Sequence, residues 1–552
     1  MTSPGIRDRM KAIVNRVGGM YMGSYLNIGS GEFQECVASE IYVDKSMIIQ
    51  MCNACIGTMQ KYICVSRPRR FGKSMILKML AAYYGKGEDS SHLFRGLKIT
   101  DTESYREHLN KYDVIVLNMQ EFLSRSGSID EMLSKIHRFL IIELKREYHG
   151  ILFLDDNDLI QVMKDIYVSQ GRKFIILIDE WDCLFREYQQ DSVAQKRYLD
   201  FLRVWLKDQA YVAMAYMTGI LPIKKYGTHS ALNMFREYSM TNPGELAEFF
   251  GFTAGEVEDL CKKYDMDYEE TRNWYDGYRF NIQGEEQISV YNPKSVVEAM
   301  LNRSFQNYWN KTETYEALKT YIEMNYDGLK EDVLKMLAGA NVKIETETFS
   351  NDMTTFTSKH DVLTLLIHLG YLRYDLNIGM VSIPNKEVSQ EYINAITGIG
   401  WKEVVESVEN SSELLQALWR KDAEKVAEGI EKVHREVSIL QYNDENALSY
   451  IVGLAFYAAR EYYTIVRELP TGEGFADICF IPRKRYIDKP AVVIELKYNK
   501  SAGGAIAQIK NKKYVETLDE YKGNLLLVGI NYDKATKKHQ CLIEEWRKEA
   551  MQ

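Results

Sequence analysis

Four short and almost wholly apolar runs, each the length of a β-strand, most strongly limit how this 552-residue chain folds. They lie at residues 62–65, 114–119, 174–179 and 211–217, and stretches with helical spacing of apolar residues separate them, for example 131–148 and 195–208. Strands that are apolar throughout are buried on both faces, and their alternation with helices is typical of a parallel sheet covered by helices. We therefore predict an α/β domain over residues 1–240.

The segment SRPRRFGKS, residues 66–74, follows the first of these strands and precedes a predicted helix. It ends like a phosphate-binding loop of the pattern GxxxxGK[ST], but Arg67 replaces the first glycine. In such a loop, backbone N–H groups and the helix N-terminus hold phosphate, the lysine neutralises its oxygens, and the hydroxyl binds Mg²⁺. Ser74 is therefore a predicted metal ligand. The predicted ATP-binding residues are Arg67, Pro68, Arg69, Arg70, Phe71, Gly72, Lys73 and Ser74.

A second motif, FIILIDEWD, completes this predicted site. The apolar strand 174–179 delivers Asp179 to the metal, and Glu180 is placed to polarise the attacking water as a catalytic residue. Thr218, at the end of the strand 211–217, is predicted to sense the γ-phosphate, although an ordinary strand-terminal threonine fits as well. Asp182 is expected to support the site. Arg69 and Arg70 fit solvated surface side chains nearly as well as phosphate ligands.

A second cluster of polar residues lies near the end of the chain, on the predicted strands FADICFIP and AVVIELKY. Because side chains alternate along a strand, Glu495 and Lys497 share one face, and strand pairing would bring Asp477 beside them. Two carboxylates can hold Mg²⁺ or Mn²⁺, which activates water, while a lysine positions the nucleophile. Asp477 and Glu495 are thus candidate metal ligands. The candidate catalytic residues are Asp477, Glu495, Lys497, Glu468 and Gln508. A structural ion pair is the alternative.

Charge is uneven along the chain. The formal net charge is -9, but residues 481–514 carry nine Lys or Arg and only two acids. Such a patch attracts phosphate, so we expect nucleic acid, and DNA in particular, as the partner of the C-terminal cluster. Contact with acidic proteins is the alternative.

Between these regions, residues 241–400 are rich in charged helical patterns. Residues 361–388 read as a helix followed by two short strands, which fits a winged-helix unit or a helical linker with one hairpin equally well. We predict this middle domain over 241–400 and a second α/β domain over 401–552.

Transport signals are not expected. No apolar run approaches the about 20 residues needed to cross a bilayer, and charges occupy the N-terminus where a signal peptide would be apolar. Eight cysteines are scattered through apolar segments, so we expect reduced thiols and a cytoplasmic protein without a membrane partner.

The motifs SRPRRFGKS, FIILIDEWD, TGILPIKKYG and WYDGYRF, with the terminal ELKYNKSAGGAIAQIKNKKY, resemble bacterial proteins that join an AAA-ATPase-like domain to a C-terminal PD-(D/E)XK nuclease-superfamily domain. The loop of that family also lacks the first glycine. The resemblance implies ATP and Mg²⁺ at Lys73, Ser74, Asp179 and Glu180, and a nuclease centre at the C-terminal cluster. It assigns no role to residues 274–280, whose aromatic side chains are more typical of packing than of base stacking.

These observations predict an ATPase whose nucleotide state controls a metal-dependent nuclease. A regulatory NTPase with a non-cleaving C-terminal domain, a signalling switch without nucleic acid, and a P-loop small-molecule kinase are the alternatives. Assembly into a homo-oligomer is open, and Arg236 is the candidate arginine finger in that case.

Overall fold

The chain folds into two compact units, Met1–Tyr308 with Ile344–Asn385 and Trp309–Lys343 with Lys386–Gln552. The structure is a computed structural model. It describes residues 16–17, 20–223, 232–282, 287–309, 315–324, 326, 328–350, 353–354, 356–436, 445–471, 474–512, 514, 518 and 524–546. Residues 224–227 of the TGILPIKKYG motif and Lys513 of the basic segment lie outside these ranges.

A five-stranded parallel sheet forms the centre of the first unit, in the order β4-β5-β6-β3-β7. Its strands are β3 (Tyr62–Ser66), β4 (Asp113–Asn118), β5 (Phe174–Asp179), β6 (Val212–Gly219) and β7 (Arg236–Tyr238). Every residue of β3, β5 and β6 is buried. The predicted parallel α/β sheet is thus confirmed, and β7 is a short edge strand that the apolar pattern did not predict.

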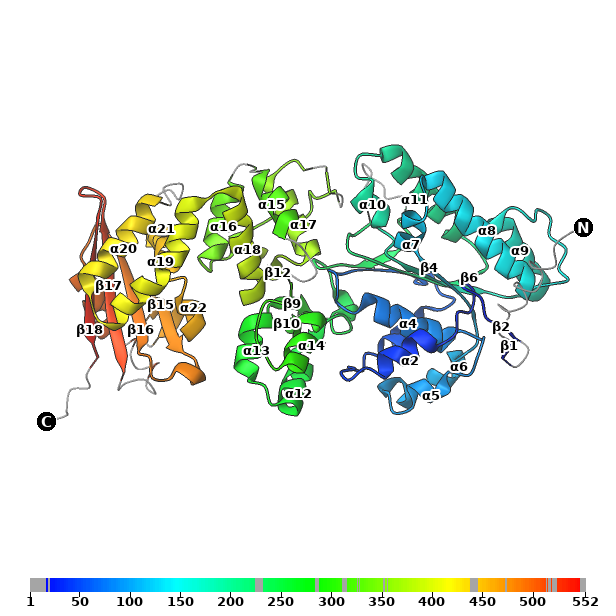
Figure 1. The fold of residues 1–552 in the computed structure, drawn as a ribbon, viewed down its shortest axis with the longest axis horizontal. Coiled ribbons are helices and arrows are strands. Elements are labelled where there is room, and N and C mark those ends of the chain that lie inside the picture. Colours follow the sequence, from blue (N-terminus) through cyan, green and yellow to red (C-terminus); the bar gives the residue numbers. More distant parts are fainter. Residues whose placement is uncertain are drawn as a thin grey trace, which may run out of the picture. The chain divides into compact units, whose positions relative to one another are not determined.

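Helices cover both faces of this sheet (Figure 1). One face carries α7 (Met119–Ser124), α8 (Ile129–Glu147), α9 (Leu159–Gln170), α10 (Cys183–Glu187) and α11 (Ser192–Leu206). The other carries α2 (Gly31–Val37), α3 (Ile48–Cys55), α4 (Lys73–Tyr84), α5 (Ser91–Phe94) and α6 (Tyr105–His108). Cys52 and Cys55 are buried on α3 in the core of this face. Short strands β1 (Arg16–Val17) and β2 (Met20–Tyr21) precede these helices, and the 3₁₀ turn η1 (Lys98–Asp101) precedes α6.

A smaller antiparallel sheet follows in the same unit, in the order β8-β10-β9. Its elements are η2 (Gly244–Leu246), β8 (Phe252–Thr253), α12 (Ala254–Tyr264), α13 (Tyr268–Tyr275), β9 (Tyr278–Asn281), β10 (Gln287–Tyr291) and α14 (Pro293–Asn302). Sequence-local caps fix the helix starts: Thr253 and Glu256 form a capping box, and Asn292 caps α14 ahead of a proline at its first turn.

The predicted helix and two strands near residue 370 are present as α17 (Lys359–Leu369), β12 (Arg373–Asp375) and β13 (Met380–Ser382), and the two strands pair antiparallel. Eight consecutive residues of α17, from Asp361 to His368, are buried. A helix that is buried on all sides is a core element. The predicted helix and hairpin are thus present, and whether they form a winged-helix unit stays a prediction.

The second unit contains a mixed five-stranded sheet, in the order β14-β15-β16-β17-β18, in which only β16 and β17 run parallel. The strands are β14 (Tyr463–Thr471), β15 (Gly474–Pro482), β16 (Ala491–Tyr498), β17 (Leu525–Asp533) and β18 (Lys538–Glu545). The strand β18 at the edge was not predicted, because buried and exposed residues are mixed along it.

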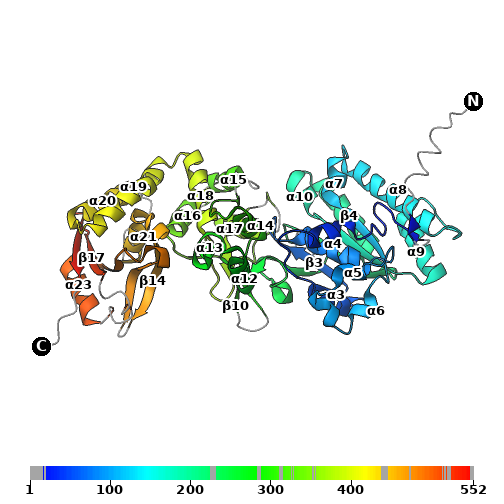
Figure 2. The ribbon, with the colours of Figure 1, turned by 60° about the horizontal axis from the view of Figure 1, so that its bottom comes forward.

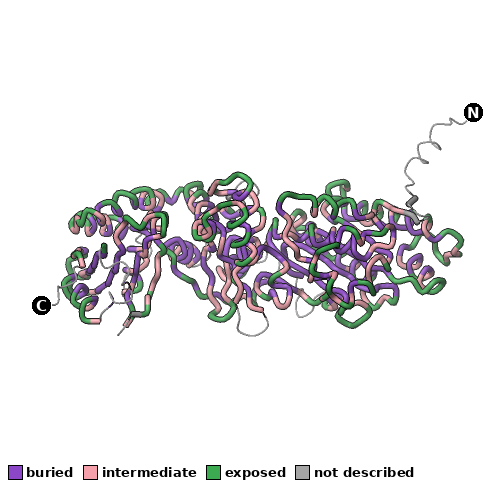
Figure 3. Tube along the Cα trace, turned by 90° about the horizontal axis from the view of Figure 1, so that it is seen from below, coloured by how far each residue is buried: buried purple, intermediate pink, exposed green. Residues whose placement is uncertain are grey.

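Helices pack on this second sheet (Figure 2). Those in contact with it are α20 (Ala423–Glu436), α21 (Glu445–Ala455), α22 (Ala459–Tyr462) and α23 (Ala502–Asn511). Of the other helices of this unit, α15 (Tyr315–Glu323) packs on α18 (Lys386–Ile399), α18 packs on α19 (Lys402–Trp419), and α19 packs on α20 and α21. The helix α16 (Leu329–Leu337) contacts β11 (Val342–Lys343), and the 3₁₀ turn η4 (Lys484–Tyr486) lies between β15 and β16. Burial is concentrated in the strands of each unit (Figure 3). The core between α23 and the sheet includes Ala491 and Val493 of β16, whose next residues in the same alternation are Glu495 and Lys497.

Candidate functional sites

The loop between β3 and α4 is shaped by two residues with positive φ. Arg70 has φ +67° and Gly72 has φ +88°. Gly72 immediately precedes the first residue of α4, and a Cβ built on it would meet no atom within 4 Å. The glycine is therefore needed for its backbone conformation and leaves the approach to the helix N-terminus open.

Lys73, the first residue of α4, points back into this loop. Its Nζ donates hydrogen bonds to the carbonyl oxygens of Arg67 and Pro68, each at 2.9 Å. The side chain is only 5% exposed, and burial lowers its pKa. Two carbonyl oxygens of the loop therefore hold the ammonium group of Lys73 in place.

Asp179 connects the ends of β5 and β6 to the start of α4. One carboxylate oxygen accepts a hydrogen bond from Ser74 Oγ at 2.7 Å. The other accepts one from Thr218 Oγ1 at 2.7 Å and one from the Glu180 N–H at 3.0 Å. The predicted metal ligands Ser74 and Asp179 therefore lie together, although 105 positions separate them in the sequence.

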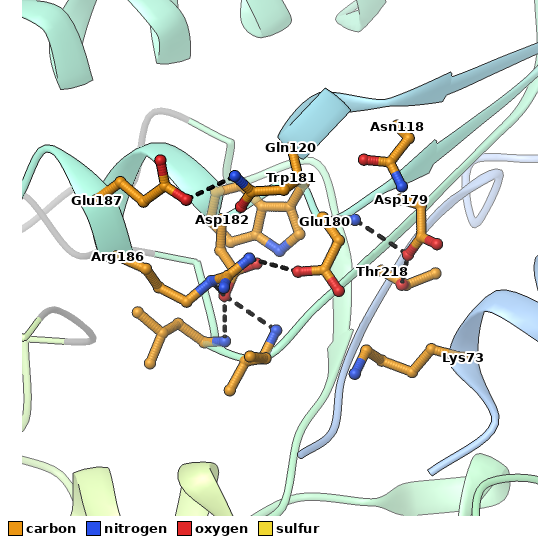
Figure 4. Close-up of polar contacts among 12 residues, drawn as sticks. Lys73, Asn118, Gln120, Asp179, Glu180, Trp181, Asp182, Arg186, Glu187 and Thr218 are labelled. Carbon is orange, nitrogen blue, oxygen red and sulfur yellow. Dashed lines mark hydrogen bonds and ion pairs between the residues drawn. The ribbon is translucent and has the colours of Figure 1, made fainter. Parts of the chain in front are cut away.

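Glu180 follows Asp179 with φ +52°, which is unusual for a residue with a side chain. Its carboxylate forms an ion pair with Arg186 of α10 (Figure 4). Burial raises the pKa of Glu180, and the charges of Arg186 and Lys73 oppose that rise. Arg186 was not predicted, because its closeness to Glu180 depends on the turn into α10.

Asp182 is fully buried and supports the site, as expected. One of its oxygens accepts hydrogen bonds from the N–H groups of Ile220 and Leu221, at 2.9 and 2.8 Å, and so holds the chain that leaves β6. A Cβ on Gly219 would lie 2.6 Å from the other oxygen and 2.7 Å from Trp181 Nε1. Glycine at 219 therefore lets the two strand ends approach each other.

A pocket of about 580 Å³ opens beside the loop. Of the predicted residues, it is lined by Arg69, Arg70, Phe71, Gly72, Lys73, Ser74 and Glu180. Its other walls are largely apolar and include Ile41, Tyr42, Val43, Phe252, Pro293 and Val297. Pockets of this size, mostly apolar with a few polar groups, are typical of small-molecule sites. The apolar walls were not predicted, because they come from segments distant in sequence.

Two predicted residues of the loop do not line this pocket. Arg67 is fully buried, and its Nη1 donates to the carbonyl oxygens of Ser66 and Tyr238 at 2.9 Å each. Pro68 contributes its carbonyl oxygen to Lys73. The sequence analysis included Arg67 among the ATP-binding residues because it belongs to the loop, at the position of the missing first glycine. The geometry instead directs its guanidinium into the protein interior.

Arg236, the candidate arginine finger, lies on β7. Its Nη1 is 2.9 Å from Glu245 Oε1, and its guanidinium lies over the ring of Tyr238. The side chain is half exposed, so its role in an assembly stays a prediction.

In the second unit, β15 and β16 bring the predicted carboxylates together. Ile478 pairs with Ile494, and Asp477 accepts a hydrogen bond from the Leu496 N–H at 2.7 Å. Burial raises the pKa of Asp477. The expected pairing of strands is therefore present, with Asp477 beside the strand that carries Glu495 and Lys497.

Glu495 is buried, with 1% of its surface exposed. Its Oε1 accepts hydrogen bonds from Lys497 Nζ at 2.9 Å and from Gln508 Nε2, whereas its Oε2 has no hydrogen-bond partner among the residues that the structure describes. Burial raises the pKa of Glu495. For Lys497, burial lowers the pKa, but the hydrogen bond and charge of Glu495 outweigh this, so the pKa is raised overall. Gln508 reaches the site from α23, as predicted.

Two further carboxylates act on this site. Glu468 of β14 is exposed, has φ +50°, and lies between residues that pair with the neighbours of Asp477. Glu445, at the start of α21, was not predicted. Its negative charge raises the pKa of both Asp477 and Lys497, so it lies near both. No signal in the sequence links this helix to the strands.

Strand β16 divides the basic segment into two parts. Arg483, Lys484, Arg485 and Lys489 precede the strand, whereas Lys497 lies near its carboxyl end and Lys500, Lys510 and Lys512 follow it. Because a strand rises about 3.3 Å per residue, Ala491 and Glu495 are roughly 13 Å apart. Only the second part therefore lies near the carboxylates.

No group of three or more His, Cys, Asp or Glu side chains suited to a metal occurs among the residues that the structure describes.

These geometries define two classes of site in one chain: a glycine-containing loop at a helix N-terminus with a carboxylate at the adjacent strand end, and a pair of carboxylates with a lysine on neighbouring strands. Residues 27–228 match the family described as Predicted AAA-ATPase, and residues 443–541 match the PD-(D/E)XK nuclease superfamily. The chain thus joins a domain of the first family to a C-terminal domain of the second, which confirms the resemblance seen in the sequence.

Among curated proteins, the chain is similar to an uncharacterized protein in the vnfD 5' region of Azotobacter chroococcum mcd 1, with 27% identity over 261 residues. The match covers 45% of this chain and 47% of that protein, so the chain spans about half the length of this relative. Within the described parts of the chain, no helix combines the length and apolarity that crossing a bilayer requires.

Two solved structures are also similar. Cdc6p from Pyrobaculum aerophilum is 10% identical, with a TM-score of 0.22, over 66% of this chain and 98% of that chain. The Aeropyrum pernix ORC2 protein, in ADPNP–ADP complexes, is 9% identical, with a TM-score of 0.28, over the same shares of 66% and 98%. At these scores, the fold assignment rests on the sheet order and the family matches.

Proposed function

We propose that the protein is an ATPase whose nucleotide state controls a metal-dependent nuclease in its C-terminal domain, with DNA as the substrate. The observation that carries the nuclease proposal is the Glu495 carboxylate, which is buried and has one oxygen without a hydrogen-bond partner in the described part of the chain. Leaving a buried carboxylate oxygen unpaired is costly, and a bound cation would remove that cost.

The first site fits ATP and Mg²⁺. A loop with an open helix N-terminus, a buried ammonium and a pocket of about 580 Å³ suits a nucleoside triphosphate. Ser74 Oγ and Asp179 are adjacent oxygen donors, as Mg²⁺ prefers. Lys73 and the amides near Gly72 would bind the phosphates, and Ser74 with Asp179 would hold the ion.

The residues around the loop support hydrolysis. Glu180 lines the pocket, and its ion pair with Arg186 fixes one end of the carboxylate. A carboxylate held there can accept a proton from an attacking water. Thr218 donates a hydrogen bond to the Asp179 carboxylate and so keeps the Asp179 side chain oriented toward Ser74. Mg²⁺, when bound, would neutralise charge that develops on the phosphate oxygens.

The second site fits a divalent ion held by Asp477 and Glu495. Lys497 donates to one Glu495 oxygen, and Gln508 donates to the same oxygen, so the other is left for a cation. Lys497 carries a raised pKa and is therefore cationic at neutral pH, where it can position a phosphodiester or its nucleophile. The ion, when bound, would lower the pKa of a water at the site.

The basic residues that follow β16 support nucleic acid as the partner. Lys500 is exposed at the carboxyl end of the strand, and the charge of Lys512 lowers the pKa of Glu495, so it lies near the site. Cationic side chains around a carboxylate pair attract phosphate to where cleavage would occur.

The test is a matched assay on the full-length chain. ATP turnover and cleavage of duplex and single-stranded DNA and of RNA are measured with Mg²⁺ or Mn²⁺, with and without ATP. Lys73→Ala should lower ATP turnover at least tenfold, because the loop loses its phosphate-binding cation. Lys78→Ala, on the same helix but in an exposed ion pair with Glu32, is the control and should leave turnover unchanged.

Glu495→Ala should abolish cleavage, with Glu544→Ala of an exposed ion pair on β18 as its control. Cleavage that survives Glu495→Ala would refute the nuclease assignment. Binding of DNA without cleavage in any metal would favour a regulatory NTPase with a non-cleaving C-terminal domain. A cleavage rate that is the same with and without ATP would refute control by nucleotide.

A further inference from the structure

The segment WYDGYRF, residues 274–280, has no role in the sites described above. It ends in β9, in which Tyr278 and Phe280 are buried and Arg279, between them, is exposed. Alternate residues of a strand share a face, so Tyr278 and Phe280 point in the same direction. Both lie against the phosphate-binding loop of the same unit.

Phe280 contacts the start of the loop. The guanidinium carbon of Arg67 lies 5.1 Å from the centre of the Phe280 ring and 5.5 Å from that of Phe250. Tyr238 accepts a hydrogen bond from Arg67 Nη1 through its carbonyl oxygen. Nε and Nη2 of Arg67 have no hydrogen-bond partner in the described part of the chain.

This environment is unusual for a cation. Burial lowers the pKa of Arg67 to about 9, so the group is still charged at neutral pH. A buried charge without a counter-ion is costly, and aromatic faces stabilise a desolvated guanidinium. The two rings therefore hold the Arg67 side chain in place. Arg67 is the residue that replaces the first glycine of the loop, so the start of the loop is held as well.

Tyr278 contacts the end of the loop. Its ring meets the ring of Phe71 edge to face, with centres 5.2 Å apart. The Phe71 carbonyl oxygen also accepts a hydrogen bond from the Gly251 N–H at 3.1 Å. The loop is thus held at both ends: at Arg67, near its start, and at Phe71, directly before Gly72.

The strand β9 is itself fixed from behind. Tyr278 donates a hydrogen bond to the Gly370 carbonyl oxygen at 2.6 Å. Gly277 has φ +141°, and a Cβ there would lie 2.1 Å from the Pro384 carbonyl oxygen, so only glycine permits this approach. Because β9 is fixed by its contacts with Gly370 and Pro384, it can resist movement of the loop that packs against it.

We propose that β9 is the rear support of the phosphate-binding loop, and that Tyr278 and Phe280 are positioning residues for nucleotide binding. Neither residue lines the pocket. They act through Phe71 and Arg67, whose positions set the direction of the backbone N–H groups and carbonyl oxygens of the loop. This inference rests on the proposed binding of a nucleotide.

The chain offers a matched control. Tyr275 lies in the same segment, is equally buried, and donates to a backbone carbonyl oxygen, that of Gln306, at 3.0 Å. Its ring packs on Phe305 and Tyr308, and no ring contact joins it to the loop among the described residues. Tyr275→Leu and Tyr278→Leu therefore remove similar side chains from similar surroundings.

The experiment measures the dissociation constant of ATP and ADP by calorimetry, together with thermal unfolding, for the full-length chain. We expect Tyr278→Leu and the milder Phe280→Leu to weaken nucleotide binding at least tenfold. Tyr275→Leu should change the dissociation constant less than twofold, even if it lowers the unfolding temperature as much as Tyr278→Leu does. Equal affinities in Tyr278→Leu and Tyr275→Leu would overturn the proposal.

A second measurement needs no nucleotide. Hydrogen exchange of the amides of residues 69–74 should accelerate in Tyr278→Leu and Phe280→Leu but not in Tyr275→Leu. If the wild-type protein binds no nucleotide, the proposed function fails, and exchange alone decides whether β9 supports the loop. Unchanged exchange in all three variants would refute it.

Discussion

A pair of buried histidines makes the stability of the second unit depend on pH. His434 of α20 and His539 of β18 share a hydrogen bond, Nδ1 to Nε2, at 2.9 Å, and both rings pack on Tyr532. Burial lowers the pKa of His434 to about 4. Burial, with the charge of His434, lowers that of His539 to about 3. Both rings are therefore neutral in the folded protein near neutral pH.

The sign of the effect follows from these values. An unfolded histidine has a pKa of about 6.5, so between about pH 6.5 and 4 the unfolded chain binds protons that the folded chain does not. Stability is therefore complete above that range and falls as the pH falls through it. A depressed pKa corresponds to about 1.4 kcal/mol per unit, which gives about 2 kcal/mol per ring at pH 5. Partial solvent access and the shared hydrogen bond reduce the sum of the two to about 2 kcal/mol.

The assay compares the wild-type chain with a variant that carries His434→Leu and His539→Leu together. Hydrogen exchange of β17 and β18 gives the local free energy of opening at pH 7 and pH 5, after correction for the intrinsic rate. The wild type should lose about 2 kcal/mol more than the variant between these values. Equal losses in the two proteins would refute the burial argument, because carboxylates elsewhere titrate in both.

Three further predictions concern the candidate sites. Gly219→Ala places a methyl group 2.6 Å from Asp182, so we expect a loss of about 1–3 kcal/mol in thermal unfolding; an unchanged melting temperature would contradict it. Thr218→Val removes the donor to Asp179 and should lower ATP turnover at least tenfold while ADP affinity, measured by calorimetry, stays the same; unaltered turnover argues against this role. Lys484→Glu with Arg485→Glu tests the basic residues that precede β16, in EDTA. If they contact phosphates, the slope of log K against log salt for duplex DNA falls by about two, and an identical slope excludes them.

The strands of the sheets were largely predictable from the sequence. Residues 174–179 were predicted as a strand and form β5 with those bounds. Five consecutive apolar residues followed by Asp179 are the length of a buried strand and too short for a typical helix. The edge strands β7 and β18 were missed. Each is buried on one side only, so neither carries the continuous apolar run that marks a central strand.

The site residues were predictable as types but not as contacts. The order of strand, loop and helix located Lys73 and Ser74, since the motif is local. The closeness of Ser74 to Asp179 depends on the strand order of the whole sheet, and that of Arg186 to Glu180 on the turn after β5. Arg67 was included in the predicted site as the residue that replaces the first glycine of the loop, whereas aromatic rings far along the chain hold its side chain inside.

The two hydrogen bonds that Lys73 makes to its own loop have a consequence for selectivity. Any anion that enters must compete with two carbonyl oxygens for the same ammonium. A single phosphate ion would replace these two hydrogen bonds of Lys73 and gain few further contacts, whereas a polyphosphate would also accept hydrogen bonds from several backbone amides of the loop. We expect the loop to reject inorganic phosphate at concentrations far above those at which it accepts ADP, and displacement of ADP by millimolar phosphate would disprove this.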